Sequence, residues 1–232
     1  MRRSPPSICC GGSWRNGSNR EAQRADGCAA EPRSLYVGAS VGTKSRRRRV
    51  TLPASFEGRE RLRLFCALRL PEEALDALPE WQAAHLRSGR IVPREHLHVT
   101  LAFLGHRPAE ELPGIAAELQ QAAAAAEPIR LLPERYRETR SVGMLVLKDL
   151  AGTATRLADG LFDRLERLGV YEREGRPWLP HVTVIRFRER PRLKASPPDL
   201  GEISPSDAAV YHSVLRSTGA QYVVVESFAL GG

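Results

Sequence analysis

The sequence predicts an α+β fold built from a duplicated unit, with two mostly antiparallel sheets that carry helices on their outer sides. The order strand, helix, strand occurs twice, and each time the second strand holds a His-x-Thr motif, at His98-Val99-Thr100 and His181-Val182-Thr183. The turns between strands are short and the helices begin after strands, which is typical of this fold class. The two motifs lie 83 residues apart, which is enough for one motif in each half.

Alternation of apolar and polar residues predicts the strands. Residues 61–70 place leucines and Cys66 on one side and arginines on the other, as in a half-buried strand. In residues 97–105, His98 and Thr100 are predicted on the face opposite the apolar residues. That apolar face is expected to hold Leu97, Val99, Leu101 and Phe103. The further predicted strands are 129–137, 143–147, 180–187, 209–215 and 222–228, of which the last two form a closing hairpin.

Three amphipathic stretches between the strands predict helices. The first begins after Pro71, which the first turn of a helix tolerates, and ends at Gly89. The second covers residues 112–126, and the third covers 155–168. Residues 190–206 are rich in proline and polar side chains, which predicts a loop.

Residues 1–58 are predicted to be a disordered basic tail, and residues 59–232 are predicted to be the folded domain. The tail holds 11 Lys and Arg against 4 Asp and Glu, whereas the remainder is nearly neutral. The net charge of +8 therefore says little about partners of the folded part. The tail has no apolar periodicity, so burial of its side chains cannot offset its chain entropy. We interpret the arginines at 46–49 as a solvated linker, while an RNA-contacting patch and a transit peptide stay open.

Cysteine usage and hydropathy indicate a cytoplasmic protein. Three cysteines lie in the tail and Cys66 lies in a predicted strand, without metal-ligand spacing or a disulfide framework, which fits a reducing compartment. No run is long and apolar enough for a secretory core or a membrane span, so no membrane partner is expected. His96 stands two residues before His98, but no third ligand accompanies the pair, so no metal is expected.

A pair of His-x-Thr strands suits the hydrolysis of a cyclic phosphodiester. Six histidines and eight threonines would give roughly 0.2 such pairs by chance, so two copies argue against an ordinary core histidine. In-line attack needs one group that takes a proton and another that gives one, and histidine does either near neutral pH. Each threonine hydroxyl would bind a phosphoryl oxygen. Because the two motifs are alike, the residues alone do not say which histidine is the acid.

These stretches resemble the 2H phosphoesterase superfamily and, within it, the RNA 2′,3′-cyclic phosphodiesterases, historically called 2′-5′ RNA ligases. Residues 97–105 and 180–186 carry the resemblance, which covers about residues 60–230. It implies a bilobal fold with a central cleft that opens terminal 2′,3′-cyclic phosphates to 2′-phosphates without a cofactor. The expected partners are RNA ends or cyclic-phosphate nucleotides, and the expected state is a monomer.

The resemblance also implies a role for each site residue. His98 would be the proton donor and His181 the proton acceptor, while Thr100, Thr183 and Arg186 would bind the phosphate. Strict alternation places Arg186 on the face opposite His181, so its role requires a bulge or a strand end. Without either, Arg186 would be a solvated charge at the strand exit.

The sequence gives weaker indications of a residue that would stack on a substrate base. The family usually has an aromatic residue where this chain has Ile91, which puts stacking from that point in doubt. Phe65, Phe103 and Tyr222 are the other candidates, but Phe103 is predicted on the face opposite His98. We therefore expect all three in the core.

Two other functions stay open at this point. The same motifs could join RNA halves through a 2′-5′ bond, which is the activity of the family's older name. Alternatively, the chain could be a non-catalytic RNA-binding module that uses the cleft and the basic tail. Such a module would bind RNA in a salt-dependent way.

Overall fold

The computed structural model describes residues 61–216 and 219–231. All of them belong to one of the two units into which the chain divides, Arg48–Gly232. The tail predicted at residues 1–58, with its arginine run and three of the four cysteines, lies outside the described residues.

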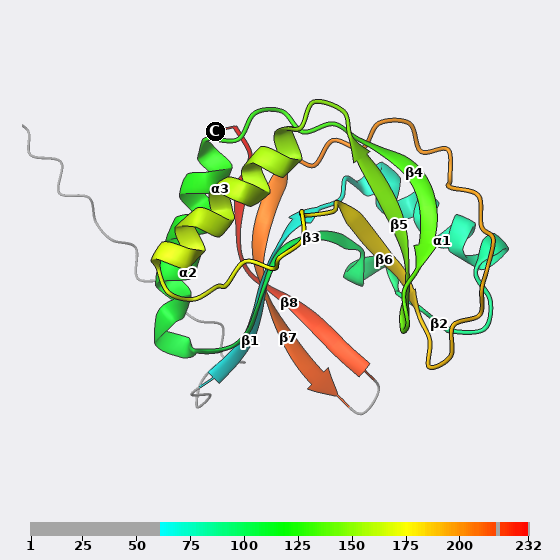
Figure 1. Ribbon diagram of the computed structural model, residues 1–232, viewed down its shortest axis with the longest axis horizontal. Helices are drawn as coiled ribbons and strands as arrows, with labels where there is room; N and C mark the ends of the chain where they lie inside the picture. The colour runs from blue at the N-terminus through cyan, green and yellow to red at the C-terminus, as the bar shows by residue number, and fades with distance from the viewer. Residues whose placement is uncertain (1–60, 217–218, 232) are drawn as a thin grey trace, which may run out of the picture. The chain divides into compact units, whose positions relative to one another are not determined.

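The described strands form an eight-stranded sheet in which every pairing is antiparallel. Its order is β4-β5-β6-β3-β1-β7-β8, and the short β2 pairs with β6 (Figure 1). The antiparallel α+β prediction is therefore confirmed. The strands are β1 (Arg61–Arg69), β2 (Arg90–Ile91), β3 (His98–Pro108), β4 (Leu131–Glu138), β5 (Val142–Asp149), β6 (His181–Arg186), β7 (Asp207–Arg216) and β8 (Gly219–Ala229).

The two predicted sheets are wings of this single sheet. The first wing consists of β1, β3, β7 and β8, and the second consists of β2, β4, β5 and β6. One residue pair, Val99 with Val182, joins β3 to β6 and so connects the wings. Sequence periodicity predicts strands but not which strands pair. The single residue pair that joins the two wings into one sheet could therefore not be predicted.

Among the described residues, three α-helices and two short 3-10 helices accompany the sheet. In α3, Leu157, Leu161 and Leu165 recur at helical spacing and are buried. Helices α2 and α3 lie together on one side of the sheet, whereas α1 lies beside the second wing (Figure 1). None of the described helices is long and apolar enough to cross a membrane. The helices are α1 (Glu72–His85), η2 (Arg94–His96), η3 (Ala109–Glu111), α2 (Leu112–Ala124) and α3 (Thr153–Arg167).

The internal repeat is present in the structure. β1, α1 and β3 form one copy, and β5, α3 and β6 form the other. In both copies the His-x-Thr strand pairs antiparallel with the strand that opens the copy. The duplicated unit predicted from the motifs is therefore confirmed at the level of strand pairing.

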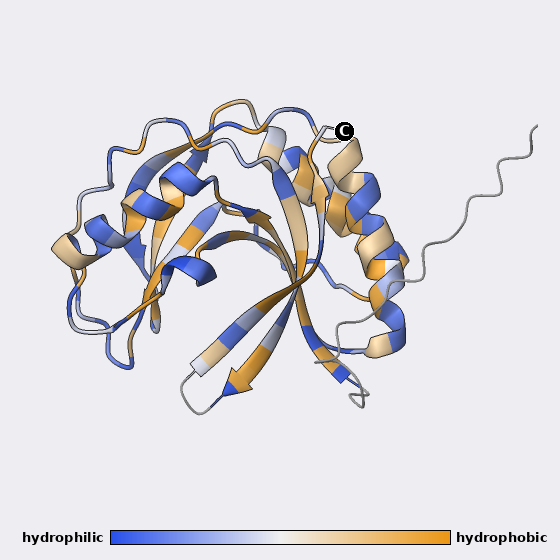
Figure 2. Cartoon of the chain, turned by 180° about the vertical axis from the view of Figure 1, so that it is seen from behind, coloured by the Kyte–Doolittle hydropathy of each residue, from blue (hydrophilic) through white to orange (hydrophobic). Residues whose placement is uncertain are grey.

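The sheet buries its two faces differently. One large apolar cluster lies between the helices and one face, and it includes fully buried leucines such as Leu64, Leu119 and Leu161. The hydropathy of β7 and β8 changes from residue to residue along each strand (Figure 2), as expected for strands with two unlike faces. On the opposite face lies a small aromatic cluster around Phe65 and Tyr211.

Two register shifts interrupt the pairing of β3 with β1, and β3 holds an extra residue at each. Phe103 pairs directly with Phe65, whose ring lies 4.9 Å from the ring of His98. Since paired residues point to the same side of a sheet, Phe103 shares the face of His98. The prediction that Phe103 lies on the apolar face, in the core, is wrong: its side chain is 48% exposed.

Gly143 of β5 is expected to tolerate no side chain. A Cβ there would overlap Tyr136 Oη and lie 2.6 Å from Ile185 Cγ2. Gly143→Ala should therefore lower the free energy of unfolding by about 1–3 kcal/mol, measured by urea denaturation. Gly160→Ala is the matched control, since its Cβ meets nothing within 4 Å on α3. That change should raise stability by about 0.5–1 kcal/mol, and equal effects at both glycines would contradict the packing argument.

Candidate active site

Four side chains converge where β3 meets β6. The paired residues Val99 and Val182 are the middle residues of the two motifs, and both are fully buried. In an antiparallel pair this register sets His98 opposite Thr183 and Thr100 opposite His181. All four side chains therefore project from one face, and opposite Cβ atoms lie roughly 5 Å apart. The structure thus brings both motifs together at a single place, and all four residues stay partly exposed there. We call these four residues the catalytic quartet, after the role that the sequence predicts for them.

Both histidines are held in the same way. Nδ1 of His98 donates to the carbonyl oxygen of His96 at 2.8 Å, and Nδ1 of His181 donates to that of Leu179 at 2.8 Å. Because a carbonyl oxygen can only accept, Nδ1 carries the proton in each neutral ring. Nε2 is therefore the ring nitrogen that is available for proton transfer. In His98 it lies 3.1 Å from Thr100 Oγ1.

Burial lowers the pKa of His98 from 6.5 to about 4. The hydrogen bond to the His96 carbonyl raises this pKa, whereas the nearby charges of His181, Arg186 and His96 lower it further. His98 is thus neutral near pH 7 when nothing is bound. Its surroundings are rich in positive charge, so an anion in contact with the ring would favour the protonated form.

Arg186 reaches the face of the histidines because β6 is irregular. Gly143 pairs with Ile185 and the next residue of β5 pairs with Thr183, so Val184 is an extra residue. Val184 and Ile185 are both buried, which breaks the alternation and returns Arg186 to the side of Thr183. The irregularity that its role required is present.

Arg186 also contacts the first wing. Its Nη2 donates to Tyr222 Oη at 3.4 Å, and its charge lowers the pKa of both His98 and His96. The backbone N–H of Tyr222 in turn donates to His96 Nε2 at 3.4 Å. The arginine is therefore placed between the two wings beside the catalytic quartet.

Gln82, which sequence reasoning missed, supports the irregular turn of β6. It is 1% exposed, and its Nε2 donates to the carbonyl oxygens of Val184 at 2.8 Å and Val92 at 3.0 Å. The backbone N–H of Val92 donates to the same Val184 carbonyl at 3.0 Å. The sequence did hold one indication of this role: Gln82 follows Leu78 by four residues and so lies on the apolar face of α1, where an amide needs hydrogen-bond partners.

Trp178 is the second residue that sequence reasoning missed. Its Nε1 donates to the carbonyl oxygen of Thr100 at 3.0 Å. This bond ties the loop before β6 to the strand that carries the other motif. No periodic pattern surrounds Trp178, so the sequence held no signal for this contact.

Aromatic rings border His98 on the first wing. The ring centroids of Phe65, Tyr211 and Tyr222 lie 4.9, 5.7 and 5.5 Å from that of His98. Phe65 is buried, as expected, but in the small cluster beside the catalytic quartet rather than in the main core. Tyr222 is only partly buried against that cluster.

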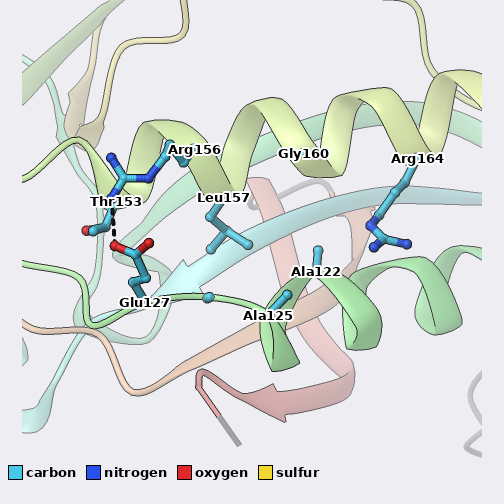
Figure 3. A pocket seen from close by; sticks show the side chains of 9 residues that line it. Ala122, Ala125, Glu127, Thr153, Arg156, Leu157, Gly160 and Arg164 are labelled. Carbon is cyan, nitrogen blue, oxygen red and sulfur yellow. Dashed lines mark hydrogen bonds and ion pairs between the residues drawn. The ribbon is translucent and has the colours of Figure 1, made fainter.

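Two pockets differ in their relation to the catalytic quartet. A pocket of about 230 Å³ lies between α2 and α3, and no predicted site residue lines it (Figure 3). A pocket of about 920 Å³ adjoins Arg186 and is also lined by Arg90, Arg188 and Arg190. The positive lining of the second pocket suits an anionic ligand. In the described part of the chain, no three His, Cys, Asp or Glu side chains gather as metal ligands would.

Comparison with known proteins finds relatives among the phosphoesterases. The family model described as LigT like Phosphoesterase matches residues 68–135. The RNA 2′,3′-cyclic phosphodiesterase of Thermus thermophilus is 35% identical over 190 residues, which cover 74% of this chain and 91% of the relative. The Escherichia coli protein of the same name is 32% identical over 143 residues, covering 53% of this chain and 71% of the relative.

Solved structures share the fold. A crystal structure of a Thermus thermophilus protein has a TM-score of 0.64 at 34% identity and covers 74% of this chain and 99% of its own. Escherichia coli LigT complexed with NADP+ has a TM-score of 0.64 at 27% identity, with 75% and 100% covered. From the extent of these matches and the paired motifs, we conclude that the chain belongs to the LigT-like phosphoesterase family.

Proposed function

We propose that this protein hydrolyses RNA 2′,3′-cyclic phosphodiester ends to 2′-phosphomonoesters, with His98 as proton donor and His181 as proton acceptor. The observation that carries the proposal is the pairing of Val99 with Val182, which sets both motifs on one face. The relatives named RNA 2′,3′-cyclic phosphodiesterase support the same reaction.

The reaction requires attack on phosphorus opposite the bond that breaks. His181 Nε2 takes a proton from water while the water oxygen bonds to phosphorus. The bond from phosphorus to O3′ breaks, and His98 Nε2 gives its proton to O3′. The products are a 2′-phosphate and a 3′-hydroxyl, and exchange of protons with water restores both histidines.

The remaining site residues stabilise the charge that develops on phosphorus. The hydroxyls of Thr100 and Thr183 lie between the two histidines and would donate to the non-bridging oxygens. Arg186 would balance the negative charge of the same group. The Thr100 hydroxyl donates to the neutral Nε2 of His98, and a bound phosphate would replace this bond.

We also propose that the protein is a cytoplasmic monomer. The cytoplasmic location is supported by Cys66, the one cysteine among the described residues, which is free and fully buried. Burial raises the pKa of its thiol to about 12, which keeps the reactive thiolate scarce. The described part of the chain thus needs no oxidising compartment.

Loss of either histidine should abolish turnover. His98→Ala and His181→Ala should each lower kcat for adenosine 2′,3′-cyclic phosphate by about 10²–10⁴-fold, because each removes one proton-transfer group. The assay measures formation of 2′-AMP with EDTA present, and circular dichroism checks that each variant is folded. Full activity of either variant would refute the assignment.

Loss of Arg186 should lower kcat/KM far more than loss of a nearby exposed arginine. Arg186→Met is expected to lower kcat/KM by about 10²-fold, because the phosphate loses its cationic partner. Arg140→Met, in the exposed turn between β4 and β5 close to Arg186, should stay within about twofold in the same assay. Equal losses would mean that only the general positive charge of this edge is used.

Binding of an anion should raise the pKa of His98 and so favour its protonated form. Because burial lowers the pKa of His98 to about 4, the ring is neutral at pH 6. Sulfate, which stays doubly negative in this range, should raise that pKa by favouring the charged ring. NMR titration of the His98 ring with and without sulfate measures the change, with chloride at equal ionic strength as control. An unchanged pKa would contradict anion binding at His98.

A further inference from the structure

An exposed aromatic ring lies on the same face as the catalytic quartet but outside it. Phe103 of β3 is 48% exposed and pairs with Phe65, the residue in ring contact with His98. An exposed phenylalanine contributes little to the core, because most of its apolar surface stays in contact with water. Its position beside the site therefore calls for another explanation.

Arg63 covers one side of this ring and is itself held in place. Its Cζ lies 4.6 Å from the Phe103 ring centroid, within the range of a cation–π contact. Its Nη1 donates at 2.8 Å to the hydroxyl of Ser213, which is 3% exposed. Within residues 61–216 and 219–231, Nη2 of Arg63 has no hydrogen-bond partner. A flat ring and a free cationic donor are thus presented together in a fixed arrangement.

The distance to the catalytic quartet matches a neighbouring nucleotide. Phe103 follows Thr100 by three residues on the same strand, which is roughly 10 Å along β3. An RNA whose cyclic end lies in the catalytic quartet must leave it in some direction. The aromatic side of the first wing is continuous with the quartet through Phe65, so it offers such an exit.

We propose that Phe103 and Arg63 bind the nucleotide that precedes the terminal one in the RNA substrate. The base stacks on the exposed part of the Phe103 ring, because stacking accepts any base. Nη2 of Arg63 donates to the phosphate that links the last two nucleotides. This proposal rests on the proposed function and adds to it a preference for RNA ends over mononucleotides.

The test compares substrates of two lengths. The probes are adenosine 2′,3′-cyclic phosphate and the dinucleotide ApA with the same cyclic end. The wild-type kcat/KM should be about 10-fold higher for the dinucleotide, which is the size of one base-stacking contact. An ApA analogue whose first nucleotide is abasic keeps the linking phosphate and should lose most of this advantage.

Substitutions then locate the binding site. Phe103→Ala should bring the ratio of the two kcat/KM values close to one, whereas Phe103→Trp should keep or raise it. Arg63→Met should lower the ratio and weaken its dependence on salt, because a phosphate contact is lost. Leu132→Ala is the matched control: this exposed side chain lies on β4 of the other wing, and its loss should leave the ratio unchanged.

The outcomes separate this inference from the proposed function. A wild-type ratio near one, or equal losses on both substrates in Phe103→Ala, would overturn the nucleotide site while hydrolysis itself stands. Failure of the wild-type protein to hydrolyse either substrate would instead overturn the proposed function. A lowered ratio in Leu132→Ala would also count against the placement on β3.

Discussion

The pairing of Val99 with Val182 is the contact on which the rest of the site depends. It joins two wings that each have several strand pairs of their own, and it does so at the centre of both motifs. A shift of one residue in this register would turn the His and Thr of one motif toward the apolar core. The buried valines oppose such a shift, because each is fully enclosed on the core side. Core packing and catalytic geometry are therefore set by the same two residues.

Irregular strands place the remaining functional side chains. In β3, the extra residue Leu101 turns Phe103 out of the core and onto the face of His98. In β6, Val184 is the extra residue, and it turns Arg186 toward the same face. The Val184 carbonyl, which leaves the regular ladder with β5, accepts from Gln82 and from the Val92 backbone. Without these partners the buried carbonyl would be costly, since an unpaired backbone group in the core destabilises the fold.

The site combines a neutral histidine, His98, with a charged arginine, Arg186. Burial keeps His98 neutral near pH 7, with its Nε2 accepting from Thr100. Arg186 remains exposed and donates a long hydrogen bond, 3.4 Å, to the hydroxyl of Tyr222. A bound phosphate would therefore meet a ready cation and a histidine whose protonation follows the anion. In the proposed reaction, binding of the phosphate would thus favour protonation of His98, so this histidine need not be charged beforehand.

The sequence by itself determined the antiparallel α+β fold, the duplicated unit and the two His-x-Thr motifs that the fold brings together. It could do so because strand alternation is local and because His98-Val99-Thr100 recurs as His181-Val182-Thr183. Only the tertiary structure decided that the two sheets are one, that Phe103 is exposed beside His98, and that Gln82 and Trp178 support the site. An extra residue in a strand reverses every later side chain, and nothing in the local pattern of apolar residues marks where it falls. Hydrogen bonds between residues about a hundred positions apart, such as Gln82 to Val184, arise only when the chain is folded.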